Sequence, residues 1–176
     1  MIDSLFPFCL RTTPMTDLQP TFIDFEASSL DLVASYPIEV GICLPSGEVR
    51  SWMIKPHVLW KDWSPSAQRI HGIAREELVS KGLDLDIVCQ KLNQTLTGLV
   101  YCDAWTFDCF WLHRLFKSGG IKPSFQLESI SALLDQEQRE RWQPTREVVI
   151  RELGLTVHRA ANDAIILHET WKRLTR

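Results

Sequence analysis

The spacing of apolar residues predicts three short strands near the start of the chain. The first 20 residues, MIDSLFPFCLRTTPMTDLQP, show no apolar periodicity and contain three prolines, so we expect residues 1–20 to form a loosely held arm. Residues 21–26 (TFIDFE), 37–44 (PIEVGICL) and 48–55 (EVRSWMIK) are β-prone runs. The turn residues Pro45-Ser46-Gly47 separate the last two runs. Short connections of this kind predict an antiparallel meander.

From Ser64 onward the pattern changes to helices that alternate with strands. Ser64 and Pro65 have the features of a helix start, and Gly72 is a typical helix end. Six further segments continue the alternation in the order helix, helix, strand, helix, strand, helix, before one last helix. These eight segments are residues 64–72, 74–82, 83–98, 99–105, 106–117, 123–130, 144–154 and 159–174. The run between 131 and 143 is helix-prone without a clear start.

This element order predicts the fold class. Antiparallel strands followed by alternating helices and strands favour an α/β fold, with a mixed sheet covered by helices on both faces. An RNase H-like sheet has this order. We therefore expect residues 21–176 to form one domain of this kind after the N-terminal arm.

Composition narrows the classes of function. The chain has 176 residues, of which 45% are hydrophobic, and no apolar run approaches the ~20 residues of a membrane-spanning helix. We therefore expect a soluble protein without a membrane partner. A net charge of −3 argues against a protein that grips long duplexes, but it allows contact with a few nucleotides at a strand end. The five cysteines form no C-x-x-C pair, which favours reduced thiols in a cytoplasmic protein over a zinc site.

The tripeptide Asp24-Phe25-Glu26 is the first candidate for chemistry. Side chains at positions i and i+2 of a strand project from the same face, so the two carboxylates lie side by side and Phe25 points the opposite way. Adjacent like charges are costly to bury, and a hard divalent cation that binds both would offset this cost. The alternative is that the strand simply ends here and both acids are solvated.

Two further acidic features lie later in the chain. Asp108 opens the helix that follows the strand LVYCDAW, at the edge of a sheet where an α/β site is expected. An acid in the first turn of a helix is also common for electrostatic reasons alone. His158 precedes the last helix, and Asp163 lies in its first turns, about one and a half turns further on. A lone histidine is more often structural, but this one accompanies an acid and two earlier acidic features.

Together these motifs resemble those of the DEDDh exonucleases. D-x-E falls at Asp24 and Glu26, F-D-x-x-W-L at 107–112 and H-x-A-x-x-D at 158–163. The segment SPSAQRIHGIAREEL (64–78) also resembles the family's segment between its first two motifs. Each motif is weak alone, whereas all of them in order are specific, and they cover residues 21 to about 175.

The resemblance implies a metal-dependent 3′–5′ exonuclease that acts on the 3′ end of RNA or DNA. It implies two divalent cations, Mg²⁺ or Mn²⁺, held by Asp24, Glu26, Asp108 and Asp163. Asp24 would bridge both ions, Glu26 and Asp163 would complete the site of the attacking water, and Asp108 would hold the second ion. His158 would be the general base.

The chain departs from the family pattern at two places. Ala27, Ser28 and Ser29 follow the D-x-E motif where the family often has Thr-Thr-Gly, and this segment approaches the terminal nucleotide in the family. Asp103 is a rival for Asp108, which we prefer because Trp111 and Leu112 follow it at the family's offsets. Trp105 is the best candidate for stacking on a base, against a simple packing role.

Two other functions are compatible with the same motifs. One is an exonuclease-like module that binds nucleic acid or a partner without cutting. The other is a proofreading subunit of a polymerase complex. All five motif positions carry chemically competent side chains, which favours an active exonuclease over a silent module. No polymerase-tethering tail is visible after the last helix, so we expect a free-standing exonuclease. The sequence leaves open whether RNA or DNA is cut and whether the chain forms a homodimer.

Overall fold

The computed structural model describes residues 19–176 and contains one mixed five-stranded sheet. The strand order is β3-β2-β1-β4-β5. The strands are β1 (Thr21–Ala27), β2 (Pro37–Cys43), β3 (Val49–Met53), β4 (Gly98–Cys102) and β5 (Phe125–Ser129). β1 to β3 form the predicted antiparallel meander, and β4 and β5 run parallel to β1. The predicted α/β fold with an RNase H-like mixed sheet is confirmed.

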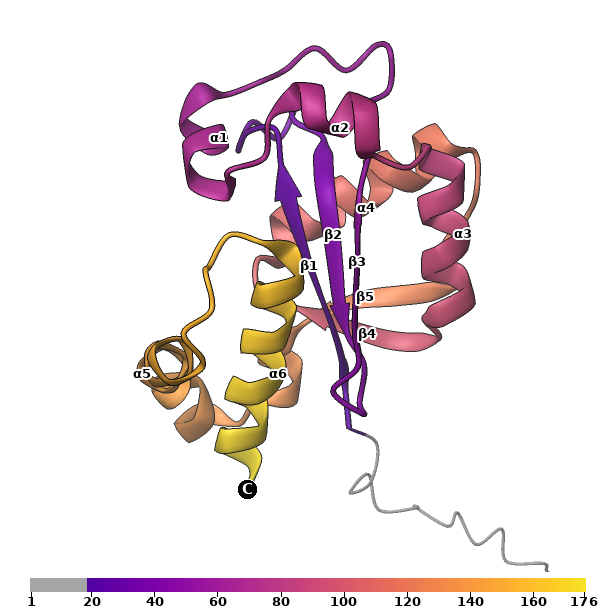
Figure 1. The fold of residues 1–176 in the computed structure, drawn as a ribbon. Coiled ribbons are helices and arrows are strands. Elements are labelled where there is room, and N and C mark those ends of the chain that lie inside the picture. The colour runs from indigo at the N-terminus through magenta and orange to yellow at the C-terminus, as the bar shows by residue number, and fades with distance from the viewer. Residues whose placement is uncertain (1–18) are drawn as a thin grey trace, which may run out of the picture.

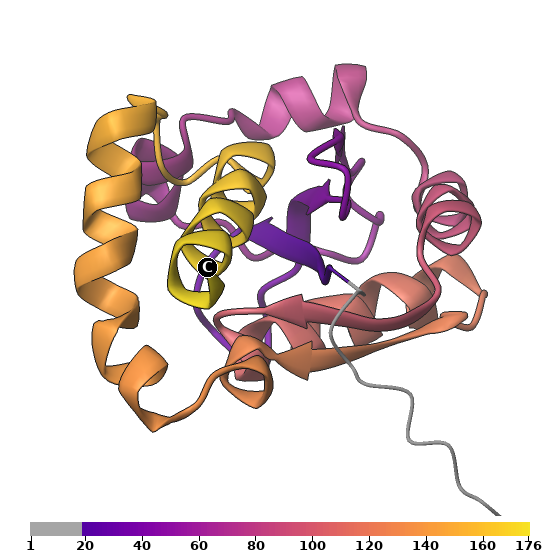
Figure 2. The ribbon, with the colours of Figure 1, turned by 90° about the horizontal axis from the view of Figure 1, so that it is seen from below.

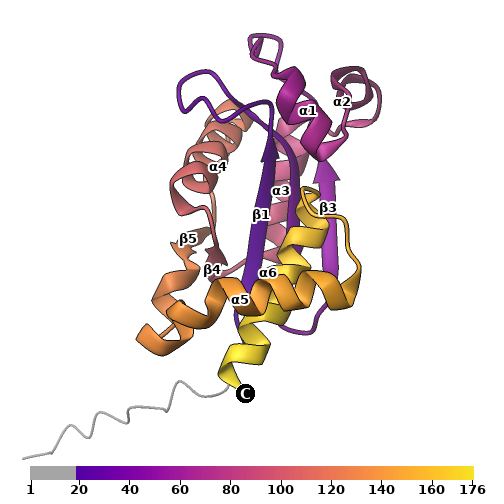
Figure 3. The same cartoon turned by 90° about the vertical axis from the view of Figure 1, so that its left-hand side faces the viewer.

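Helices cover both faces of this sheet, as predicted. α6 packs against β1 and β2 on one face with α5 on its outer side, and α4 packs on the opposite face beside α3 (Figures 1 and 3). Seen from below, α5 and α6 lie on one side of the β1 strand and α4 on the other (Figure 2). The helices are α1 (Pro65–His71), α2 (Arg75–Lys81), α3 (Leu85–Thr95), α4 (Trp105–Gly119), the 3₁₀ turn η1 (Ile130–Leu133), α5 (Gln136–Leu153) and α6 (Ala160–Thr175).

Local capping explains where several helices begin. The Ser64 side chain accepts a hydrogen bond from the Ala67 N–H, and Pro65 occupies the first helical position, as predicted for α1. The prediction that the fifth helix begins at Pro144 was wrong, because α5 begins at Gln136 and contains Pro144. Its true start is a capping box in which Asp135 and Gln138 bond each other's backbone.

Of two further predicted boundaries, one differs from the structure and one lies mostly outside the described residues. Gly98 was expected to end a helix, but α3 ends at Thr95 and Gly98 instead begins β4. The predicted arm, residues 1–20, lies outside the described residues except for its last two positions. Within the described part of the chain, no helix combines the length and the apolar content that crossing a membrane requires.

The alternation of β1 divides its side chains between two cores. Ile23 and Phe25 belong to the larger apolar cluster, which includes residues of α3 and α4. Phe22 belongs to a second cluster with residues of α5 and α6. Because side chains alternate along a strand, Asp24 and Glu26 share the face of Phe22 and point toward α6.

Gly41 on β2 allows the start of α6 to lie directly on the sheet. Gly41 is the partner of Asp24 in the β1–β2 pairing. A Cβ atom at Gly41 would lie 2.2 Å from the carbonyl carbon and oxygen of Ala160, a distance that real Cβ contacts do not reach. The absence of a side chain at this position therefore sets how closely α6 approaches β1.

We expect Gly41→Ala to lower the free energy of unfolding by about 1–3 kcal/mol, because α6 must move away from the sheet. Ser51→Ala is the matched control, since Ser51 is the exposed β3 partner of Gly41 and should tolerate the change within about 0.5 kcal/mol. Urea denaturation of the three proteins measures both effects. Equal midpoints for Gly41→Ala and wild type would contradict this account of the contact.

Candidate active site

Three carboxylates meet between β1 and α6. Asp24 and Glu26 come from the C-terminal half of β1, and Asp163 comes from the first turn of α6. Each offers an oxygen atom, and these three atoms lie within 4.8 Å of one another. The spacing of Asp24 and Glu26 predicted that their side chains share a face, and the structure places them so. Asp163 reaches them through the packing of α6 on the sheet.

Asp108 approaches the same place from the opposite helix layer. It lies in the first turn of α4, where it is 1% exposed, and its Oδ2 atom has no hydrogen-bond partner. Asp103, its rival in the sequence, is exposed on the connection between β4 and α4. Asp103 and Asp108 both line one pocket, which also contains Asp24, Glu26 and Asp163. The buried position next to the cluster belongs to Asp108, which supports the preference for it over Asp103.

Burial raises the pKa of all four carboxyl groups, and repulsion by neighbouring carboxylates adds to the shift at Asp24 and Glu26. Burial, with Asp108, Asp163 and Glu26 nearby, raises the pKa of Asp24 well above its usual range. Burial raises the pKa of Glu26 to about 8 and that of Asp108 to about 7. The pKa of Asp163 is also raised by burial, although backbone N–H groups and Arg146 counteract the shift. The charged forms of these groups are therefore costly unless a cation compensates them.

The residues present fit a divalent cation. Carboxylate oxygens are the ligands that Mg²⁺ and Mn²⁺ prefer, and three of them lie close enough to share one ion. Asp108 adds a buried oxygen that no group of the protein satisfies. A bound cation would offset the repulsion that raises these pKa values. Asp24, Glu26 and Asp163 could thus hold one ion, whereas the role of Asp108 as a metal ligand stays a prediction.

His158 lies at the rim of the same pocket. It is exposed, it precedes α6 and it has a φ of 64°, a left-handed conformation that histidine adopts more readily than most residues. The next N–H group, that of Arg159, donates to Oδ2 of Asp163 at 3.1 Å. The start of α6 therefore brings His158 and Asp163 to one site.

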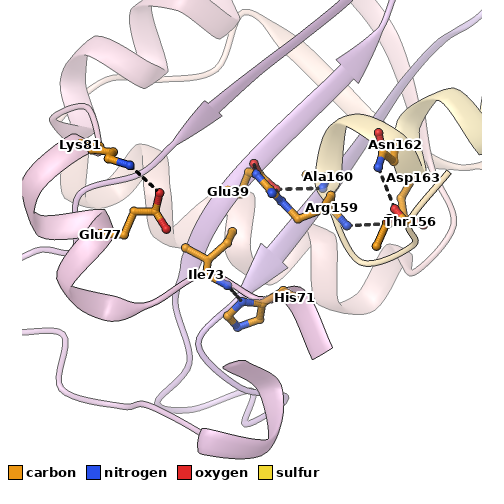
Figure 4. A network of polar contacts seen from close by, with 10 residues as sticks. All are labelled: Glu39, His71, Ile73, Glu77, Lys81, Thr156, Arg159, Ala160, Asn162 and Asp163. Carbon is orange, nitrogen blue, oxygen red and sulfur yellow. Dashed lines mark hydrogen bonds and ion pairs between the residues drawn. The ribbon is translucent and has the colours of Figure 1, made fainter. Parts of the chain in front are cut away.

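Glu39 fixes the start of α6 on the sheet. It is 2% exposed on β2, opposite Glu26 in the β1–β2 pairing. Its carboxylate accepts hydrogen bonds from Nε and Nη2 of Arg159 at 3.0 and 2.7 Å, and from the Ala160 N–H at 3.0 Å (Figure 4). The negative charge also complements the positive end of the helix. Sequence reasoning missed Glu39, because only strand pairing and helix docking bring it to Arg159.

The walls of the pocket are mainly apolar. Leu30, Ile70 and Phe107 line it, and Leu30 and Ile70 are 71% and 58% exposed although both are large and hydrophobic. Exposed apolar side chains around a polar centre are typical of a binding site. Sequence reasoning could not single out Leu30 or Ile70, because an apolar residue alone does not reveal whether it is buried.

Only some of the predicted substrate-binding residues line the pocket. Ala27 and Ser29 line the pocket. Ser28 is fully buried, and its hydroxyl donates to Asp62 at 2.7 Å and accepts from the Tyr36 N–H at 3.1 Å. The Ser28 side chain therefore shapes the loop from within. Trp105 is 45% exposed at the start of α4 and does not line the pocket, so its contact with a base stays a prediction.

The chain resembles known proteins in its fold. No protein-family model matches the chain, and no curated protein matches it. Solved structures do: a mixed sheet with helices on both faces, as found here, is the fold of exonucleases that resemble RNase H.

Several of the similar structures are of exonuclease I. E. coli exonuclease I in complex with a dA16 oligonucleotide has a TM-score of 0.66 and 17% identity, covering 89% of this chain and 41% of that one. The moderately thermophilic exonuclease I from Methylocaldum szegediense has a TM-score of 0.64 and 17% identity, with 89% and 40% covered. The zinc-bound E. coli complex with single-stranded DNA has a TM-score of 0.64 and 16% identity, with 89% and 40% covered. The chain spans about two fifths of their length, and this likeness establishes the fold.

We expect Mg²⁺ to raise the melting temperature more at pH 8 than at pH 5. The pKa of Glu26 is raised to about 8 from 4.5, so the stability associated with its protonated form is present below about pH 4.5 and is lost as the pH rises through 8. A cation binds the deprotonated carboxylates and should restore the loss. Thermal melts at both pH values, with Mg²⁺ and with a chelator, measure the effect.

Glu26→Gln is the matched variant for this measurement. It removes the titrating group, so the melting temperature of the metal-free protein should depend less on pH than that of wild type. A shift caused by Mg²⁺ that is equal at pH 5 and pH 8 in wild type would refute the proposed competition between protons and the cation.

Proposed function

We propose that this chain is a metal-dependent 3′–5′ exonuclease that hydrolyses phosphodiester bonds at the 3′ end of single-stranded or short RNA or DNA. The observation that carries the proposal is the cluster of Asp24, Glu26 and Asp163, whose oxygen atoms lie within 4.8 Å of one another in a pocket. The fold shared with exonuclease I supports it, because E. coli exonuclease I has been solved with a bound dA16 oligonucleotide.

The pocket suits the end of a single strand. Leu30, Ile70 and Phe107 supply apolar surface on which an unpaired base can pack without its identity being read. The net charge of −3 offers little attraction for a long duplex. A chain end that enters the pocket needs only a few contacts, so both observations favour a short, unpaired substrate segment.

Asp24, Glu26, Asp108 and Asp163 would hold two divalent cations, Mg²⁺ or Mn²⁺. Cations bound there would make the attacking water more acidic and neutralise charge that develops on the phosphate. The pairing of β1 with β2 and the docking of α6 fix three of these carboxylates on rigid elements. The side chains therefore need little reorganisation before the reaction.

His158 accepts the proton in the proposed mechanism. The water oxygen forms a bond to phosphorus as His158 takes a proton from the water, and the bond between phosphorus and the leaving O3′ breaks. The O3′ atom then takes a proton from a solvent water molecule, and the protonated His158 returns its proton to solvent. The products are a strand shorter by one nucleotide and a nucleoside 5′-monophosphate. His158 lines the pocket beside Asp163, and the Glu39–Arg159 contacts anchor the residue that follows it.

The proposal is tested on matched RNA and DNA oligonucleotides labelled at the 5′ end. With Mg²⁺ or Mn²⁺ we expect a ladder of labelled products that shortens from the 3′ end, and no products with a chelator. The relative rates on RNA and DNA identify the preferred sugar. Absence of cleavage under all these conditions, with binding of the oligonucleotide retained, would favour a silent binding module instead.

His158→Ala tests the proposed base. We expect turnover to fall by about 10²–10⁴-fold while the Mg²⁺-induced rise in melting temperature is retained, because His158 removes a proton and holds no metal. His113→Ala is the control, since His113 is exposed on α4 and does not line the pocket. Equal rates for His158→Ala and wild type on a short oligonucleotide would exclude this role.

A further inference from the structure

Arg146 is a positively charged residue in the pocket that contains the carboxylate cluster. It lies on α5, which packs on α6, and its side chain is 23% exposed. Among the lysines and arginines of residues 19–176, Arg146 is the one that lines the active-site pocket. The metal-binding carboxylates proposed above do not explain why a guanidinium group lies among them.

The hydrogen-bonding capacity of Arg146 is largely unused. Nη2 contacts Oδ1 of Asp163 at 3.4 Å, which is long for an ion pair, and Nε is buried without a partner. Arg159, by contrast, donates two short bonds to Glu39. A guanidinium group has five N–H donors, so Arg146 retains donors for a group that the folded chain does not supply.

The charges around Arg146 indicate which hydrogen-bond acceptor would use its free donors. A fixed positive charge beside Asp163 weakens the attraction of the carboxylates for a divalent cation, which makes Arg146 unfavourable if metal binding is the only purpose of the site. A phosphate anion removes the conflict, because it can contact a bound cation and a guanidinium group at once. Arginine also matches the geometry of phosphate oxygens with two parallel N–H groups.

We propose that Arg146 binds the phosphate of the 3′-terminal nucleotide, the group that leaves as the 5′-phosphate of the product. This inference rests on the proposed function and adds a substrate-binding residue to it. Arg146 acts in recognition of the phosphate and leaves the proton transfer to His158. Sequence reasoning could not identify it, because it lies outside the motifs and inside a helix whose start was predicted incorrectly.

The test compares Arg146→Gln with wild type in two titrations. AMP and dAMP are titrated separately in the presence of Mn²⁺, and Mn²⁺ is titrated without nucleotide. We expect Arg146→Gln to bind the monophosphates at least about tenfold more weakly, and to bind Mn²⁺ as tightly as wild type or more tightly. Arg146→Lys should be intermediate for the monophosphates, because it keeps the charge and loses the paired donors.

Arg141→Gln is the matched control. Arg141 is on the same helix, pairs with Glu137 and has a side chain that is 59% exposed. The Arg141→Gln substitution removes one positive charge at a position outside the pocket, so both titrations should match those of wild type.

Four results would overturn the inference. If Arg146→Gln binds AMP and dAMP as wild type does but binds Mn²⁺ more tightly, Arg146 is only a counter-charge for Asp163. If it loses affinity for both Mn²⁺ and the monophosphates, Arg146 positions Asp163. If wild type neither binds the monophosphates nor degrades oligonucleotides, this inference and the proposed function both fail. Degradation by wild type with unchanged monophosphate binding in Arg146→Gln refutes the inference alone.

Discussion

The geometry of the site is governed by the mutual repulsion of carboxylates that meet, buried or half-buried, between β1 and α6. Asp24, Glu26 and Asp163 each offer an oxygen within 4.8 Å of the others, and burial raises the pKa of all three. A folded chain gains no stability from such a cluster by itself. A positively charged ligand would offset this repulsion, and carboxylate oxygens are the ligands that a hard divalent cation prefers.

Several features outside the cluster hold it together against this repulsion. Gly41 lets the backbone of Ala160 lie directly on β2, and Glu39 accepts hydrogen bonds from Arg159 and Ala160. Together they fix the start of α6, and with it Asp163. The same helix start places His158 at the pocket rim, so one docking contact positions a proposed metal ligand and the proposed base.

Local signals explain what could be predicted from the sequence. Ser64 and Pro65 begin α1 through bonds within four residues, and Asp24 and Glu26 share a face because strands alternate. The predicted start of α5 is wrong because a proline such as Pro144 is common at the first position of a helix. The capping box at Asp135 is the stronger signal for the start of this helix.

Residues that act through tertiary contacts gave no such signal. Glu39 meets Arg159 only after β2 and α6 are packed together, and Arg146 meets Asp163 only after α5 docks on α6. Neither Glu39 nor Arg146 lies in one of the motifs, so the sequence around them does not distinguish them from surface residues. The motifs thus identified the groups proposed for the chemistry, and the fold was required to find the groups that orient and neutralise them.

The most direct test of the central claim is an anomalous difference map from crystals grown with Mn²⁺. We predict a manganese peak in contact with carboxylate oxygens of Asp24, Glu26 and Asp163. A map without a peak at these residues, at Mn²⁺ concentrations that support hydrolysis, would contradict it.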